Sequence, residues 1–168
     1  ERLGGPGHWL LALPAAHIAG LQVLLRALLH PVASAPSTTA PTAAAPTAAA
    51  HPPAAPSVTA LPAGPFDAAV CAAATAALPG PRRYSSLVPA QLARLLSDDA
   101  GRAALASYDA VLVGGAATPA ELLERARAEG IALVTTYGSS ETCGGCVYDG
   151  LPLAGVQIGL DGRRVRLS

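Results

Sequence analysis

The chain has 168 residues, about the size of one domain, and 51% of them are hydrophobic, although alanine supplies much of that share. Eleven Lys and Arg residues balance eleven Asp and Glu residues, so no net field attracts nucleic acid or anionic lipid, and we expect no nucleic-acid partner. The three cysteines are too few for a disulfide-stapled secreted domain, which favours a cytoplasmic location.

Residues 1–32 are predicted to form a strand and a helix. The apolar run from Trp9 to Leu13 closes at Pro14 and is typical of a buried strand. Apolar residues then recur at helical spacing: Ile18, Leu21, Leu25, Leu28 and Leu29. His17 therefore lies at the junction between strand and helix. We expect no membrane span, because proline and polar residues interrupt the apolar stretch: Pro14, His17, Gln22 and Arg26.

Between residues 33 and 65 the composition changes to Ala, Pro, Thr and Ser, with near-repeats such as APTAAAPTAAAHPPAAP. Proline removes backbone donors that helices and sheets need, and few side chains here are large enough to form a core. We therefore predict a flexible or extended insert without fixed structure. A solvated linker explains this composition better than a proline-rich docking site does.

Residues 66–168 are predicted to form the main α/β part of the chain. Asp67 to Leu78 and Pro89 to Leu96 have helical patterns, and Arg82-Arg83-Tyr84 between them suggests the start of a short strand. Near the end, Val156–Leu160 and Arg163–Leu167 flank Asp161-Gly162, a dipeptide favoured in tight β-turns. A β-hairpin is expected there.

The clearest unit is a β-α-β arrangement. Ala110–Val113 is typical of a buried strand, and Gly114-Gly115-Ala116 forms the turn after it. Thr118-Pro119-Ala120-Glu121 has the pattern of a capping box with proline at the first helical position, and Gly130 ends the helix near Glu129. Ile131–Thr135 is the second strand, which such a crossover places parallel to the first.

This geometry predicts a single pocket. Gly114-Gly115 and Tyr137-Gly138 both follow the carboxyl ends of strands in one sheet. Open parallel sheets bind ligands at that edge. We therefore expect the two glycine-bearing segments to face the same ligand.

Two interpretations compete for the stretch TTYGSSETCGGCVYDG, residues 135–150. Cys143 and Cys146 have the spacing of a metal or redox pair. A zinc site needs further ligands, however, and the histidines and Cys71 are distant in sequence. The structural alternative is two small buried thiols in a tight Gly-Gly turn.

The residues just before the cysteines suit a nucleotide. Tyr137 offers a flat face to a base, and Gly138 allows the backbone to come close. Ser139 and Ser140 offer hydroxyls to phosphate, while Glu141 is an oxygen ligand suited to magnesium. A polar turn capped by Ser and Glu is the structural alternative.

Three stretches together carry a family resemblance: LPAAHIAGLQVLLRALL, RRYSSLVPAQLARLL and TYGSSETCGGCVYDGLPLAGVQIGLDG. With GGAATP, they resemble the adenylate-forming superfamily, which includes acyl-CoA synthetases. They are similar in particular to o-succinylbenzoate:CoA ligases of menaquinone biosynthesis in high-GC actinobacteria. The resemblance covers nearly all of the chain outside residues 33–65, and it implies part of the large N-terminal domain of such an enzyme.

The resemblance also implies roles for single residues. Gly114, Gly115 and Ala116 would line the adenine pocket, Tyr137 and Gly138 would hold the adenine, Ser140 would contact phosphate and Glu141 would hold magnesium. His17 would lie near the reacting carboxylate, unless it is a helix-capping histidine satisfied in the core. Cys143, Gly144 and Gly145 would form the wall of the acyl pocket.

The implied substrates are ATP with Mg²⁺, an aromatic carboxylic acid and coenzyme A. The family's lysine-bearing phosphate loop is expected before Glu1, and its ribose-binding aspartate and small C-terminal domain are expected after Ser168. The chain is thus interpreted as an internal fragment that binds ATP weakly alone, and the full-length protein as a possible homo-oligomer. The alternatives are another AMP-forming acyl-CoA synthetase, an inactive truncated remnant, or a small redox or metal-binding protein built around Cys143 and Cys146.

Overall fold

A computed structural model describes residues 3–29, 57–162 and 164–168. Its centre is a seven-stranded sheet in the order β2-β1-β3-β4-β5-β6-β7. The strands are β1 (His8–Leu11), β2 (Val58–Ala60), β3 (Arg83–Leu87), β4 (Ala110–Val113), β5 (Leu133–Ser139), β6 (Gly144–Tyr148) and β7 (Leu151–Pro152). Neighbours from β2 to β5 pair in parallel, and β6 and β7 extend the sheet antiparallel. The predicted mostly parallel α/β fold is confirmed.

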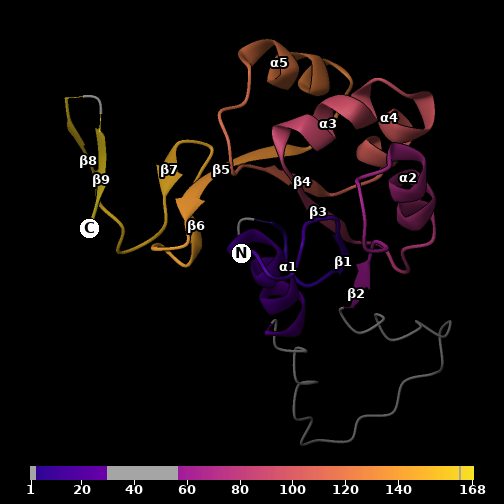
Figure 1. Ribbon diagram of the computed structural model, residues 1–168, viewed down its shortest axis with the longest axis horizontal. Helices are drawn as coiled ribbons and strands as arrows, with labels where there is room; N and C mark the ends of the chain where they lie inside the picture. The colour runs from indigo at the N-terminus through magenta and orange to yellow at the C-terminus, as the bar shows by residue number, and fades with distance from the viewer. Residues whose placement is uncertain (1–2, 30–56, 163) are drawn as a thin grey trace, which may run out of the picture.

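Helices cover both faces of the sheet (Figure 1). They are α1 (Ile18–Leu28), α2 (Ala68–Ala76), α3 (Pro89–Leu96), α4 (Asp99–Ala106) and α5 (Ala120–Ala128). Helix α1 lies on one side, and the other four helices lie on the opposite side (Figure 1). Because strand side chains alternate between faces, Leu10 of β1 packs in the core toward α2–α5, whereas Trp9 and Leu11 pack in the core toward α1.

The local sequence explains most helix starts. Asp67 and Asp98 precede α2 and α4, and each side chain accepts a hydrogen bond from a backbone N–H of the first turn. Helix α3 begins at Pro89, where a missing N–H costs nothing. The capping box predicted for α5 is wrong, because Pro119 is the capping residue and no side chain bonds to the first turn.

Three strands differ from the sequence-based expectations. Part of the predicted insert is ordered, since Val58–Ala60 form β2 and pair with β1; positions 33–56 lie outside the described residues. Strand β5 continues through Ser139 because β6 pairs with it antiparallel. The segment Gly144–Tyr148, which was expected to begin as a turn, is itself a strand.

A two-stranded hairpin ends the chain, as predicted. It consists of β8 (Ile158–Asp161) and β9 (Arg164–Leu167). Asp161 pairs with Arg164, so the turn begins one residue later than expected. The hairpin stands apart from the seven-stranded sheet (Figure 1).

The described part of the chain has no helix that is long and apolar enough to cross a membrane. Helix α1, at the most apolar stretch, has 11 residues. A span of the hydrocarbon layer needs about 20.

Leu96→Ala is expected to lower the free energy of unfolding by about 2–5 kcal/mol, because the Leu96 side chain is 0% exposed in the core. The same substitution at Leu160 of the hairpin, which is 77% exposed, should change it by less than about 0.5 kcal/mol. Urea unfolding of both variants measures the difference. Equal losses would contradict the described packing.

Candidate functional site

A cavity of about 480 Å³ lies at the carboxyl ends of β1, β3, β4 and β5, beside the start of α1. It is the kind of position where parallel sheets bind ligands. Six of the residues predicted from the sequence line it: His17, Gly114, Gly115, Gly138, Gly144 and Gly145. The expectation that the two glycine-bearing segments face one pocket is therefore confirmed.

Glycine is needed at two of these positions because backbone or side-chain atoms lie against them. A Cβ at Gly138 would overlap the carbonyl of Gly144 across the β5–β6 pair. A Cβ at Gly114 would overlap Thr136 of the neighbouring strand. The glycines therefore allow β4, β5 and β6 to approach closely at the cavity floor.

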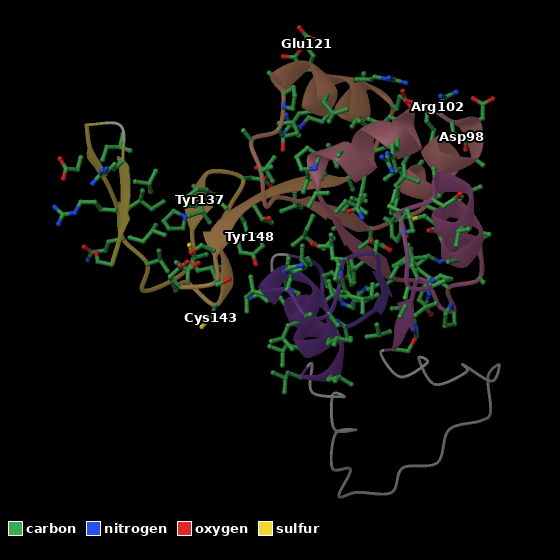
Figure 2. The ribbon with its side chains drawn as sticks, viewed as in Figure 1. Asp98, Arg102, Glu121, Tyr137, Cys143 and Tyr148 are labelled. Atoms are coloured by element: carbon green, nitrogen blue, oxygen red, sulfur yellow. The ribbon has the colours of Figure 1, made fainter. Side chains whose placement is uncertain are left out.

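Two residues predicted on the adenine side do not line the cavity. Tyr137 belongs to β5, where a loop was expected, and its side chain is 51% exposed. It lies near the end of the sheet that carries β6 and β7 (Figure 2). Ala116 is exposed beyond Gly115. Both are accessible to a ligand, but they stand outside the cavity that holds Gly114 and Gly138.

Ser140 and Glu141 lie on an exposed turn between β5 and β6. The Thr142 hydroxyl stabilises this turn, because its oxygen accepts a hydrogen bond from the Ser139 N–H at 2.8 Å and lies 2.7 Å from the Gly144 carbonyl. Hydrogen bonds from the Ser139 side chain and from the backbone lower the pKa of the Glu141 carboxyl. A negative charge is therefore available at the turn.

His17 caps α1 with extended backbone, and its side chain makes no capping hydrogen bond. The side chain is exposed and lines the cavity. The alternative of a capping histidine satisfied in the core is therefore wrong. An imidazole at this place can meet a ligand that enters the cavity.

Arg26 is a cavity residue that was not predicted as part of the site. Its Nη2 donates to Gln22 Oε1 and to the Tyr148 hydroxyl, both at 2.6 Å. The guanidinium carbon lies 5.7 Å from the Trp9 ring centroid and 6.0 Å from that of Tyr148. No ion pair within residues 3–29, 57–162 and 164–168 includes Arg26. A half-buried cation without a carboxylate partner is suited to an anionic ligand.

The cysteines of the CGGC sequence face different surroundings. Cys143 is exposed at the end of the turn and has a positive φ of 54°, and Figure 2 shows its sulfur on the outside. Cys146 is buried in β6, and its Sγ donates to the Tyr137 carbonyl at 3.6 Å. The expectation of two buried thiols in a Gly-Gly turn is wrong for Cys143. Among the described residues, no group of three or more His, Cys, Asp or Glu could hold a metal ion.

A thiol reagent at about pH 8 is expected to modify Cys143 quickly and Cys71 only after unfolding, because the thiolate is the reactive form. Burial raises the pKa of the Cys71 thiol to about 11, so its thiolate is scarce at that pH. The absorbance of the thiol released from the reagent follows the modification of Cys143 and of Cys71, and Cys143→Ser should remove the fast phase. Fast modification of Cys71 in the folded chain would contradict the packing of α2.

The family model described as "AMP-binding enzyme" matches residues 4–165. The chain belongs to the AMP-binding enzyme family. The match runs from just before β1 into β9, so it includes every element around the cavity. The resemblance based on the three sequence stretches is confirmed at the level of the family.

Curated relatives narrow the comparison within AMP-binding enzymes. The chain is 47% identical over 158 residues to a probable 2-succinylbenzoate–CoA ligase of Mycobacterium tuberculosis, covering 94% of this chain and 35% of the relative. It is 42% identical over 85 residues to 2-succinylbenzoate–CoA ligase of Escherichia coli, covering 50% of this chain and 18% of the relative. The chain thus spans about a third of the length of the Mycobacterium tuberculosis relative.

Solved structures share the fold. E. coli MenE with a bound OSB-AMS analogue superposes with a TM-score of 0.63 at 26% identity, over 98% of this chain and 30% of that one. Bacillus subtilis o-succinylbenzoate coenzyme A synthetase in complex with ATP and magnesium ion gives 0.64 at 22% identity, over 94% and 29%. The arrangement of sheet and helices is therefore that of an adenylate-forming domain.

Proposed function

We propose that the chain is part of an AMP-forming ligase that joins 2-succinylbenzoate to coenzyme A in menaquinone biosynthesis. The observation that carries the proposal is the cavity itself, which combines the glycine-bearing ends of β4 and β5 with the cation of Arg26. The glycine-bearing strand ends suit a nucleotide, and the Arg26 cation suits the carboxylates of an acid. The identity to 2-succinylbenzoate–CoA ligases supports the choice of acid.

The nucleotide would bind at the β4 and β5 end of the cavity. Gly114, Gly115 and Ala116 would present backbone to the adenine, and Tyr137 with Gly138 would form its other wall. This assignment is supported by the close strand approach at Gly114 and Gly138 and by the accessibility of Tyr137. Ser140 would contact phosphate from the adjoining turn.

Magnesium would be held by Glu141. Mg²⁺ is usually bound through one or two carboxylates together with substrate phosphates and water. A single ionised carboxylate on an exposed turn fits that pattern. When bound with ATP, the ion neutralises phosphate charge.

The acid would bind at the α1 and β6 end. 2-Succinylbenzoate carries two carboxylates, and Arg26 would pair with the one that does not react. Gly144 and Gly145 would leave room for the aromatic ring, with Cys143 at the rim. His17 would lie near the reacting carboxylate, since it lines the cavity from the start of α1.

The reaction would have two steps. A carboxylate oxygen of the acid attacks the α-phosphorus of ATP, and pyrophosphate leaves with the electron pair of the broken P–O bond. The thiol of coenzyme A then attacks the acyl carbon, AMP leaves, and the thiol proton is released. Residues of this chain would orient the acid and the nucleotide for the first step.

We also propose a cytoplasmic location, which the three free cysteines support. A homo-oligomer of the full-length protein remains a prediction. Sedimentation of the protein expressed from its complete gene would test it.

Calorimetry with two acids tests the proposed function on the chain. 2-Succinylbenzoate is expected to bind at least about 10-fold more tightly than 4-oxo-4-phenylbutanoate, which lacks the ring carboxylate, because a hydrogen bond between charged groups contributes about 1.5–3 kcal/mol. Equal affinities would favour another acyl-CoA synthetase. No binding of either acid together with a non-cooperative thermal melt would favour an inactive remnant.

A further inference from the structure

Gln22 connects two parts of the site through both ends of one side-chain amide. Its Oε1 accepts a hydrogen bond from Arg26 Nη2 at 2.6 Å. Its Nε2 donates to the backbone carbonyl of Cys143, a residue 121 positions away along the chain. Arg26 is at the acid end of the cavity, and Cys143 ends the turn that carries Ser140 and Glu141.

The contact between Gln22 and the turn is close packed. Gly144 has a φ of +104°, and a Cβ there would overlap the Gln22 amide. Cys143 also has a positive φ, so two successive residues adopt a backbone that side chains disfavour. The turn closes on itself through the Cys143 N–H and the Ser140 carbonyl at 3.1 Å. Gln22 thus bonds to the turn at Cys143, the first of two successive residues with positive φ.

The direction of the amide follows from Arg26. A guanidinium donates and cannot accept, so Arg26 orients the Gln22 oxygen toward itself and leaves the NH₂ group for Cys143. A bond to a charged group is stronger than a neutral one. Any ligand that draws the guanidinium away from Gln22 therefore also changes the donor that holds the turn.

We propose that Gln22 is a positioning residue that couples occupancy of the acid end to the nucleotide-binding turn. This inference rests on the proposed function, because it takes Arg26 as the partner of the acid's second carboxylate. Coupling between two binding sites is reciprocal, so acid should change the affinity for nucleotide by the same factor as nucleotide changes the affinity for acid. The bridge from Arg26 to Cys143 is the physical link.

The test measures that factor in the protein expressed from its complete gene. Calorimetry gives the affinity for α,β-methylene-ATP with Mg²⁺, which cannot release pyrophosphate, with and without saturating 2-succinylbenzoate. We expect the acid to change the affinity for this analogue by about 10-fold in the wild type, within the usual range for coupled sites. In Gln22→Met, which keeps the size and loses both bonds, the factor should fall to about one.

Two further variants make the result specific. Gln22→Glu keeps an acceptor for Arg26 but places a negative charge there, so it should weaken 2-succinylbenzoate binding by about 10-fold and barely affect 4-oxo-4-phenylbutanoate. Gln157→Glu, an identical change at an exposed residue preceding the C-terminal hairpin, should alter neither affinity nor coupling. Melting curves establish that each variant is folded.

The outcomes separate the inference from the function on which it rests. An intact coupling factor in Gln22→Met, with a wild type that turns over 2-succinylbenzoate, would overturn the inference alone. A wild type that does not turn over this acid would overturn the proposed function and the inference with it. Loss of coupling in Gln22→Met, with unchanged coupling in Gln157→Glu, would support the inference.

Discussion

Arg26→Met is expected to raise the KM for 2-succinylbenzoate by about 10- to 100-fold in the protein expressed from its complete gene. Arg26 is half-buried in the cavity wall, and no ion pair in the described part of the chain includes it. A charge-assisted hydrogen bond contributes about 1.5–3 kcal/mol, which sets the size of the loss. Initial rates at varied acid concentration measure it.

Two comparisons show whether the Arg26 effect comes from the second carboxylate. Arg26→Lys keeps the charge without the planar fork and should give an intermediate KM. With 4-oxo-4-phenylbutanoate, Arg26→Met should differ little from the wild type. Arg127→Met on the exposed side of α5 is the matched control. An equal loss with both acids would contradict the assignment of Arg26 to the carboxylate.

Glu141→Gln is expected to lower kcat by about 100-fold and to raise the Mg²⁺ concentration needed for half-maximal rate. The substitution keeps the shape of the side chain and removes its charge, and electrostatic groups at such sites are worth about 10²–10³ in kcat. Rates at varied Mg²⁺ and saturating ATP measure both effects. Glu124→Gln on α5 serves as the control, since that glutamate is also exposed.

The pH dependence of the Glu141 effect follows from its hydrogen bonds. They lower the pKa of the carboxyl, so the ionised form persists to more acidic pH than in free glutamate, whose pKa is about 4.3. Titration of the ATP phosphates affects the wild type and Glu141→Gln alike, so the ratio of their Mg²⁺ requirements should stay constant from about pH 6 to about pH 8. A ratio that changes with a midpoint in that range would contradict Glu141 as the metal ligand.

Much of the fold could be predicted because local signals agreed with the tertiary structure. The run Ala110–Val113 is buried at every position. Pro89 begins α3, and Pro119 and Gly130 flank α5. Strand β2 was missed because Val58–Ala60 is short and follows a proline-rich tract. Its order comes from pairing with β1, which no local pattern reveals. Helix α4 was also missed, although its sequence separates buried from exposed positions and Asp98 caps its first turn.

The glycines of the site were predicted from the sequence, whereas Arg26 and Gln22 were not. Glycine positions such as Gly114 and Gly138 are visible in a sequence because they follow strands. Arg26 and Gln22 look like mere interruptions of an apolar helix, although their spacing of four residues on one face was an available signal. Their importance depends on contacts with Tyr148 and Cys143, more than 100 positions away. Such long-range pairs need the folded chain to be seen.

Release of pyrophosphate from ATP tests the central claim most directly. The protein expressed from its complete gene is mixed with ATP, Mg²⁺ and one acid at a time, first without and then with coenzyme A. The account predicts pyrophosphate release that requires 2-succinylbenzoate, falls with 4-oxo-4-phenylbutanoate, and is followed by formation of the acyl-CoA thioester. Pyrophosphate release with an unrelated acid but not with 2-succinylbenzoate would contradict the account. The absence of pyrophosphate release with every acid tested would contradict it as well.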